Sequence, residues 1–424
     1  MNRSATGLAI AGVYGGSVGL LFLADTILSA NVSPAVFGEY TLTRNALPLI
    51  LAVGLFGVDQ ALTRALATKP FPGALRSILG QRIFRVALVG LVAGVAIRLL
   101  GAEWRSSLVV LVCAVAVCIS ELVSAALRGQ GSYVTSSMIQ QGYRLLLAFL
   151  LIVGIVALGV TSYTYVLLSL LLACTGVGLV AAIAARAMWR EAPDPAHRRA
   201  LNRMAGGFGI SMLSLAALDW LDQAMVTLLS TDLATTGAYN IHKLWGVYPL
   251  LSLASIGGFL LMPELVRDRD RLSPARLRWL LLVGGLLAIA LAAIVLTFSV
   301  LLLPHIVQMP VDTGLLALFV VIGAVRFFYL VPSAALGAVG TDTLIRSAST
   351  WGLIPVVLMP AIAALLSTAV DVKLAVSAAL LVATVMRTGI SVGAAWKAVS
   401  GRIAPPPVAV NDNLVPPTKS VPSV

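Results

Sequence analysis

The chain has 424 residues, of which 59% are hydrophobic and only 11% are charged, and its mean hydropathy is +0.99. No water-soluble core could bury that much apolar surface, so the composition excludes a soluble globular protein. The formal net charge of +12 is spread over separate short loops, which argues against nucleic-acid binding and favours attraction to anionic lipid headgroups in the bilayer.

Apolar runs long enough to cross a bilayer, about 20 residues each, follow one another from Gly7 to Trp396. In chain order they predict an all-α polytopic membrane protein with about twelve transmembrane helices. The approximate bounds are 7–30, 42–66, 81–101, 106–127, 138–160, 163–188, 205–230, 242–265, 279–303, 312–338, 345–368 and 373–396. The first run is too long for a signal peptide and resembles a later segment, so we count it as a span.

Loop cations gather on one side of the membrane in this topology. The rich side holds the cations of 69–85, Arg128 and Arg144, those of 186–203 and 267–278, Arg346, and Arg387, Lys397 and Arg402. The positive-inside rule places this side, and both chain termini, in the cytoplasm. The proline-rich segment 404–424 has no apolar face and is predicted to be a disordered cytoplasmic tail.

Two pairs of similar segments indicate an internal repeat. The segment 124–131 reads SAALRGQG and 333–340 reads SAALGAVG, while 37–44 reads FGEYTLTR and 236–243 reads TGAYNIHK. The repeat predicts two six-helix lobes, 1–195 and 196–403, related by an axis along the membrane normal because six is even. Two such lobes would enclose a central cavity that opens to either side by rocking.

Charged groups within apolar spans are costly, about 2.5–3.5 kcal/mol at the bilayer centre on insertion scales, and therefore mark candidate sites. Arg326 lies near the middle of the tenth span. It would either contact an anionic group that crosses the membrane or form a structural ion pair, for which Glu121 of the fourth span is a possible partner.

Three carboxylates lie in the first and seventh spans. Asp219 and Asp222 are one helical turn apart and share a face, and the repeat register places Asp25 at a related depth. These groups, together with Glu121 of the fourth span, would bind a coupling proton or sodium ion, lock the lobes together, or simply bond to neighbouring side chains.

Further cations and polar residues lie near the ends of the spans. Arg44 and Lys243 occupy equivalent repeat positions on the cation-poor side, where they would attract phosphate or acidic sugar, or anchor the helices at the interface. Arg128 and Arg144 lie in a cytoplasmic cluster with Gln130, Gln140 and Gln141, a candidate entry point for a headgroup. Tyr14, Tyr40, Tyr133, Tyr143, Tyr239, Trp245 and Tyr248 are typical of interfacial belts, with sugar stacking as the alternative.

The sequence contains no signature of catalysis or of a cofactor. There is no phosphate-binding glycine loop, hydrolase elbow or metal-ligand spacing, and the loops are too short for a catalytic domain. Cys113, Cys118 and Cys174 fall within apolar spans and indicate packing residues, not disulfides. We therefore expect a transporter without a cofactor or metal, not an enzyme.

Four stretches resemble the polysaccharide (O-antigen type) flippases of the multidrug/oligosaccharidyl-lipid/polysaccharide exporter superfamily. They are 32–40 (VSPAVFGEY), 54–64 (GLFGVDQALTR), 124–131, and 219–230 (DWLDQAMVTLLS) running on to Gly237-Ala-Tyr239. The resemblance covers the whole membrane region. It departs from the family pattern because Asp25 has no neighbouring arginine and the segment 335–340 lacks a basic residue equivalent to Arg128.

The resemblance implies a flippase that moves polyprenyl-pyrophosphate-linked oligosaccharide repeat units across the bacterial inner membrane for surface polysaccharide synthesis. It further implies alternating access coupled to a proton or sodium ion, a monomer, and a polysaccharide polymerase as a possible partner. Arg326, Arg44 and Lys243 would hold pyrophosphate or acidic sugar. Two alternatives remain open: a cation-coupled multidrug exporter of the same superfamily, for which the carboxylates argue, and a membrane-embedded sugar polymerase, which the short loops disfavour.

Overall fold

The computed structural model describes residues 3–68, 73–186, 188, 195–307 and 311–401. The regular structure in these ranges is helical throughout. The α-helices are α1 (Arg3–Asn31), α2 (Pro34–Leu55), α3 (Val58–Thr68), α4 (Ala74–Leu99), α5 (Trp104–Gly129), α6 (Tyr133–Ile152), α7 (Tyr163–Ala184), α8 (Pro195–Ser230), α9 (Leu233–Gly246), α10 (Tyr248–Arg267), α11 (Pro274–Ile306), α12 (Thr313–Val339), α13 (Asp342–Trp351), α14 (Leu353–Leu366) and α15 (Val372–Ser400). A π-helical turn, Val153–Ala157, extends α6, and a short 3-10 turn, Arg269–Arg271, precedes α11. The predicted tail 404–424 lies outside the described residues.

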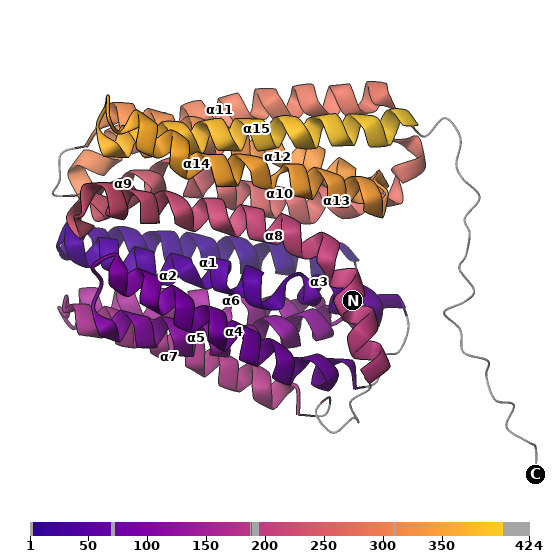
Figure 1. Ribbon diagram of the computed structural model, residues 1–424, viewed down its shortest axis with the longest axis horizontal. Coiled ribbons are helices and arrows are strands. Elements are labelled where there is room, and N and C mark those ends of the chain that lie inside the picture. The colour runs from indigo at the N-terminus through magenta and orange to yellow at the C-terminus, as the bar shows by residue number, and fades with distance from the viewer. Residues whose placement is uncertain (1–2, 69–72, 187, 189–194, 308–310, 402–424) are drawn as a thin grey trace, which may run out of the picture.

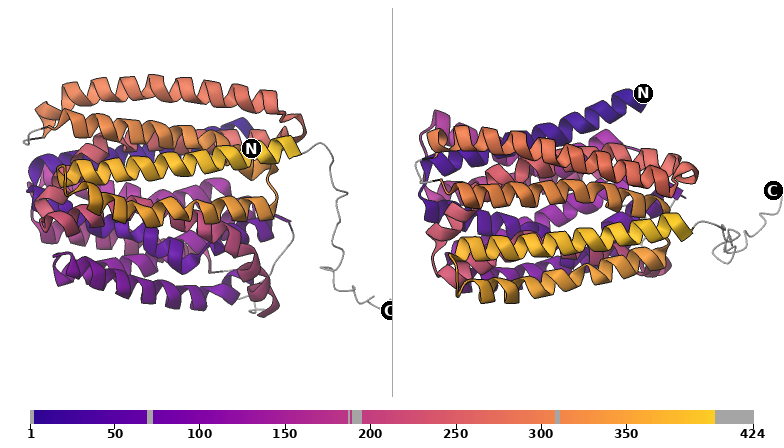
Figure 2. Two further views of the ribbon diagram at one scale, coloured as in Figure 1. Left: turned by 45° about the horizontal axis from the view of Figure 1, so that its top comes forward. Right: turned by 90° about the horizontal axis from the view of Figure 1, so that it is seen from above.

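The helices run back and forth along one axis of the bundle (Figures 1 and 2). Among the described residues, nine helical stretches are long and apolar enough to cross a membrane, or ten when the bent pair Pro34–Leu55 and Val58–Ala67 counts as one. Three further helices, α4 and the consecutive pair α9 and α10, lie outside this set and fall in the ranges where the sequence predicts the other two spans. The predicted all-α membrane architecture is therefore confirmed.

Local sequence signals set the ends and bends of these helices. A side chain before the helix accepts a backbone N–H in seven cases among the described residues: Ser33 for α2, Ser162 for α7, Asp232 for α9, Ser273 for α11, Asp312 for α12, Thr341 for α13 and Asp371 for α15. At Asp232 the N–H of Ala234 lowers the pKa of the carboxyl. A bend of 61° separates α2 from α3, where Phe56 and Gly57 both have positive φ angles.

Two lobes of similar packing make up the bundle, α1–α7 and α8–α15 (Figure 1). In the first, α5 packs on α3, α4 and α7, and α6 packs on α1 and α7. In the second, α12 packs on α10, α11 and α15, while α13 and α14 pack on α8, and α14 packs on α15. The same neighbours recur in the same order, which fits a parallel repeat.

The lobes meet most closely where α2 and α9 begin. A Cβ on Gly38 would lie 2.1 Å from the Leu233 carbonyl oxygen, and one on Gly237 would lie 1.9 Å from that of Pro34. Only glycine permits this approach of two backbones. The Asn240 amide nitrogen also donates to the Thr41 hydroxyl across the interface, at 2.7 Å. The repeated glycine-tyrosine segments thus have a packing role between the lobes.

A second contact lies toward the other end of the bundle, where the chain begins. Arg82 of α4 is 2% exposed and donates to the carbonyls of Gly54 and Leu55 and to the side chain of Asn202 in α8. The sequence pattern assigned Arg82 to a loop. This assignment is wrong, because Arg82 is buried within α4. Its guanidinium donates to carbonyl groups that the bend after α2 leaves without helical partners.

Candidate functional site

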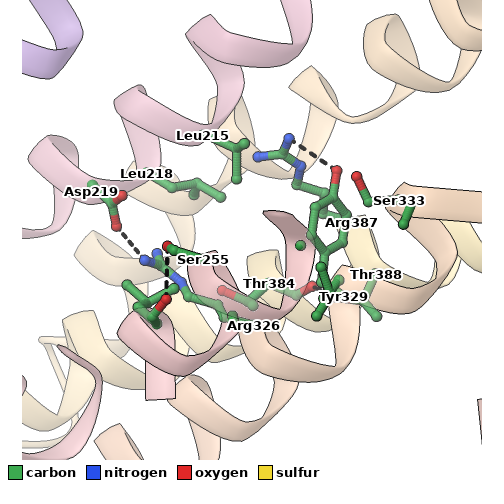
Figure 3. Close-up of a pocket in the computed structure, with 15 residues that line it drawn as sticks. Leu215, Leu218, Asp219, Ser255, Arg326, Tyr329, Ser333, Thr384, Arg387 and Thr388 are labelled. Atoms are coloured by element: carbon green, nitrogen blue, oxygen red, sulfur yellow. Dashed lines mark hydrogen bonds and ion pairs between the residues drawn. The ribbon is translucent and has the colours of Figure 1, made fainter. Parts of the chain in front are cut away.

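A cavity of about 310 Å³ lies within the second lobe, between α8, α10, α12 and α15 (Figure 3). Its lining is mostly apolar but includes three charged side chains, Asp219, Arg326 and Arg387, and the phenol of Tyr329. Four hydroxyl groups complete the lining: Ser255, Ser333, Thr384 and Thr388. A few polar groups on an apolar wall are the usual composition of a small-molecule site.

Arg326 projects from α12 into this cavity and forms an ion pair with Asp219 of α8 (Figure 3). The Arg326 side chain is only 10% exposed, whereas that of Asp219 is 41% exposed. The expected cation within the tenth span is therefore present and paired. The expected pairing of Arg326 with Glu121 is wrong, because Glu121 lies in the other lobe and accepts a hydrogen bond from Gln140.

Arg387 is the second cation of the cavity. The loop pattern placed it at the membrane surface, but it lies midway along α15 and is 5% exposed. Its Nη2 donates to the Tyr329 hydroxyl and to the Ser211 carbonyl, both at 3.4 Å, and its guanidinium lies 5.2 Å from the Tyr329 ring centre. Its buried Nη1 has no hydrogen-bond partner among the described residues.

A buried triad lies beside the cavity, within the second lobe. Lys243 donates from Nζ to the Asp222 carboxylate at 2.6 Å, and the Tyr239 hydroxyl donates to the same oxygen at 3.0 Å. The backbone N–H of Gln223 also donates to this carboxylate, at 2.8 Å. Asp222 is 0% and Lys243 1% exposed, so each charge depends on the other for stabilisation.

The first lobe contains the related triad. Arg44 donates to both carboxylate oxygens of Asp25, at 2.6 and 2.5 Å, and the Tyr40 hydroxyl donates to Asp25 at 3.1 Å. Arg44 and Tyr40 occupy the repeat positions of Lys243 and Tyr239. The sequence suggested that the two cations lie at an open cavity mouth and that the tyrosines belong to interfacial belts. Both expectations are wrong, because the two cations are buried in ion pairs and the two tyrosines are buried beside them with hydrogen bonds to the same carboxylates.

A half-buried polar cluster lies in the first lobe, toward the end where the chain begins. Gln140 of α6 connects two charges of α5: its amide nitrogen donates to Glu121 at 2.9 Å and its oxygen accepts from Arg128 at 2.7 Å. Tyr14 of α1 donates to the same oxygen. The structure thus brings Arg128, Glu121 and Gln140 together, as the cluster in the sequence suggested for Arg128 and Gln140.

Arg144 continues this cluster one helical turn farther along α6. It donates to Gln141 at 3.1 Å and to the Tyr143 hydroxyl at 3.2 Å, and Ser17 of α1 also donates to Gln141. Arg144 and Arg128 are both partly exposed, unlike Arg44 and Lys243. Of the five candidate substrate-binding cations, Arg326, Arg128 and Arg144 keep some exposed surface beside other polar groups.

The four candidate carboxylates each bond within their own lobe, and Glu121 accepts from Gln140 in the first. Asp25 pairs with Arg44 in the first lobe, while Asp219 and Asp222 pair with separate cations of the second. The alternative that they lock the lobes together therefore does not fit the described contacts. The described residues also contain no group of three or more metal-ligating side chains. The two arginines and one carboxylate that line the cavity are suited to binding an anion.

No family model and no curated protein matches the chain. Solved structures do: the chain covers 96% of an inward-facing multidrug resistance MATE family transporter of the MOP superfamily, with 91% of its own length, a TM-score of 0.63 and 14% identity. The chain also covers 95% of an outward-facing conformation of a multidrug resistance MATE family transporter, with 93% of its own length, a TM-score of 0.60 and 14% identity. A third structure is a MOP superfamily transporter from Pyrococcus furiosus, for which the reverse polarity of the binding pocket suggests a different function. The chain covers 95% of it with 93% of its own length, a TM-score of 0.59 and 15% identity. The chain has the fold of MATE family transporters of the MOP superfamily.

Proposed function

We propose that the chain is a flippase that carries polyprenyl-pyrophosphate-linked oligosaccharide repeat units across the bacterial inner membrane for surface polysaccharide synthesis. The observation that supports this most strongly is the polarity of the second-lobe cavity. It contains two arginines and one carboxylate, so it carries a net positive charge. This charge would stabilise an anionic substrate in the cavity and would repel a cationic one.

The chemistry of pyrophosphate suits these two arginines. A guanidinium presents several N–H donors in one plane and binds phosphate oxygens bidentately. Arg387 and Arg326 line the same cavity, and the Nη1 of Arg387 has no hydrogen-bond partner among the described residues. The hydroxyls of Ser333, Thr384 and Thr388 supply further donors. In the low dielectric of the membrane interior, such donors attract charge more strongly than in water.

The two-lobe architecture supplies a route for alternating access. We place the end of the bundle with the chain termini in the cytoplasm, from the distribution of loop cations. The half-buried Arg128 and Arg144 then meet the headgroup on that side, while the Gly38–Gly237 contact closes the opposite side. Rocking of the lobes that separates this contact would release the substrate outward, with the polyprenyl tail remaining in lipid.

A cation-coupled multidrug exporter is the second candidate. Its supporting observation is Asp219, whose side chain is 41% exposed and lines the cavity, together with the multidrug transporters among the structural neighbours. Asp219, however, is paired with Arg326, and Arg387 adds a further positive charge. The anionic substrate therefore fits the cavity better.

A flipping assay in proteoliposomes tests the proposal. Purified protein is reconstituted with a short-chain prenyl-pyrophosphoryl sugar in both leaflets, and an impermeant glycosyltransferase is added outside. A flippase lets the enzyme modify nearly all of the lipid, whereas empty liposomes expose only about half. Arg326→Ala should behave as empty liposomes do. If wild-type protein gives the same extent of modification as empty liposomes and exports a cationic dye, the proposal is overturned in favour of drug export.

A further inference from the structure

We infer that Asp219 competes with the substrate for Arg326: its carboxylate occupies the anion site when the cavity is empty and is displaced when pyrophosphate binds. This inference rests on the proposed function, because it concerns the same cavity. It assigns Asp219 a role as a built-in substitute for the substrate's phosphate, in place of a role as an ion-coupling site.

The unequal exposure of the pair carries the first step. The Arg326 side chain is 10% exposed and held within the helix packing, whereas the Asp219 side chain is 41% exposed. Figure 3 shows the Asp219 carboxylate beside the Arg326 guanidinium at one edge of the cavity. Asp219 is thus the partner that has free space beside it in the cavity and can turn away when another anion arrives.

The second step is the difference between the two aspartates of α8. Asp222 is 0% exposed and accepts from Lys243, Tyr239 and the Gln223 backbone. The Asp219 carboxylate has one ion-pair partner among the described residues, Arg326. Lys243 donates a hydrogen bond to the backbone carbonyl oxygen of Asp219 but forms its ion pair with the Asp222 carboxylate. Displacement of Asp219 therefore breaks one ion pair and leaves the buried triad intact.

The third step is the state of Arg387. Its buried Nη1 has no hydrogen-bond partner in the part of the chain that the structure describes, and the whole residue is only 5% exposed. An anion entering the cavity would first satisfy this donor and would then share the Arg326 guanidinium. Without Asp219, the empty cavity would hold two uncompensated arginines. Asp219 therefore lowers the cost of the empty cavity and weakens substrate binding by the same competition.

Isothermal titration calorimetry with inorganic pyrophosphate, at one pH and salt concentration, tests the competition. Asp219→Asn should bind pyrophosphate at least about tenfold more tightly than wild type, because Arg326 no longer has an internal anion. Asp219→Glu keeps the competing charge and should bind within about threefold of wild type. Arg387→Gln should weaken binding in both backgrounds. Asp371→Asn, an exposed helix cap that asparagine also fills, is the matched control.

The outcomes separate the two proposals. Equal affinity of wild type and Asp219→Asn would overturn the competition and leave the anion-binding cavity standing. No pyrophosphate binding to either protein would overturn the cavity itself and with it the proposed function. Should Asp219→Asn fail to fold, Asp219→Ala/Arg326→Gln removes both charges, and its affinity must then fall below that of wild type. Tighter binding with slower flipping by Asp219→Asn would support the inference, because the substrate is then released less readily.

Discussion

Removal of Lys243 is the sharpest test of the buried triads. In Lys243→Met the Asp222 carboxylate, 0% exposed, would keep two donors among the described residues, the Tyr239 hydroxyl and the Gln223 N–H. Breaking a buried ion pair from one side typically costs about 3–5 kcal/mol, because the remaining charge is uncompensated. We expect that loss for Lys243→Met and a similar loss for Asp222→Asn.

The double variant Asp222→Asn/Lys243→Met separates the ion pair from the packing. With both charges gone, most of the destabilisation should disappear, so the coupling energy between the two substitutions should be at least about 2 kcal/mol. Arg276→Ala is the control: it breaks the pair with Asp268, whose side chains are 39% and 32% exposed, and should cost at most about 1 kcal/mol.

Unfolding of the purified protein by titrated denaturing detergent measures these differences. Trp220 and Trp245 lie in α8 and α9, close to the triad, and are 9% and 7% exposed, so their fluorescence reports local unfolding. Lys243→Met must shift the transition well beyond Arg276→Ala. Equal shifts for the two variants would refute the argument that Lys243 compensates a fully desolvated carboxylate.

Three further predictions concern the interface, the first-lobe triad and the tail. Gly237→Ala places a methyl group within 1.9 Å of the Pro34 carbonyl oxygen, so it should prop the lobes apart and raise labelling of a cysteine introduced nearby; unchanged labelling would contradict the contact. Tyr40→Phe removes a hydrogen bond to Asp25 and should cost about 1–3 kcal/mol in the same unfolding titration, and no measurable cost would remove Tyr40 from the triad. Deletion of 404–424 should leave flipping at wild-type rates, whereas lost activity at normal protein abundance would show that the tail has a functional role.

The overall fold could be predicted because its signals are local. Each span is a long apolar run, and the repeat is visible as two similar segment pairs, so helix order and the two-lobe pattern follow from the sequence. Breaks within a helix are harder to predict from the sequence. The bend at Phe56 and Gly57 and the break after Gly246 lie within apolar runs that each predict a single span. Hydropathy averages over such a bend and cannot place it.

The partners of the charged residues could be predicted only in part. Asp25, Arg44, Asp222 and Lys243 were recognised as unusual, but which pairs form depends on helix rotation, which a sequence without contacts does not specify. Arg387 was missed because its span is bordered by other cations. Its position midway between Val372 and Ser400 is the signal that distinguishes it from them.

Lipid analysis of cells depleted of this protein tests the central claim most directly. We predict that mass spectrometry will show accumulation of polyprenyl-pyrophosphate-linked oligosaccharide, with less surface polysaccharide, and that wild-type protein but not Arg326→Ala will reverse both changes. Unchanged lipid-linked sugars in the depleted cells would contradict the account and make drug export the leading explanation of the fold.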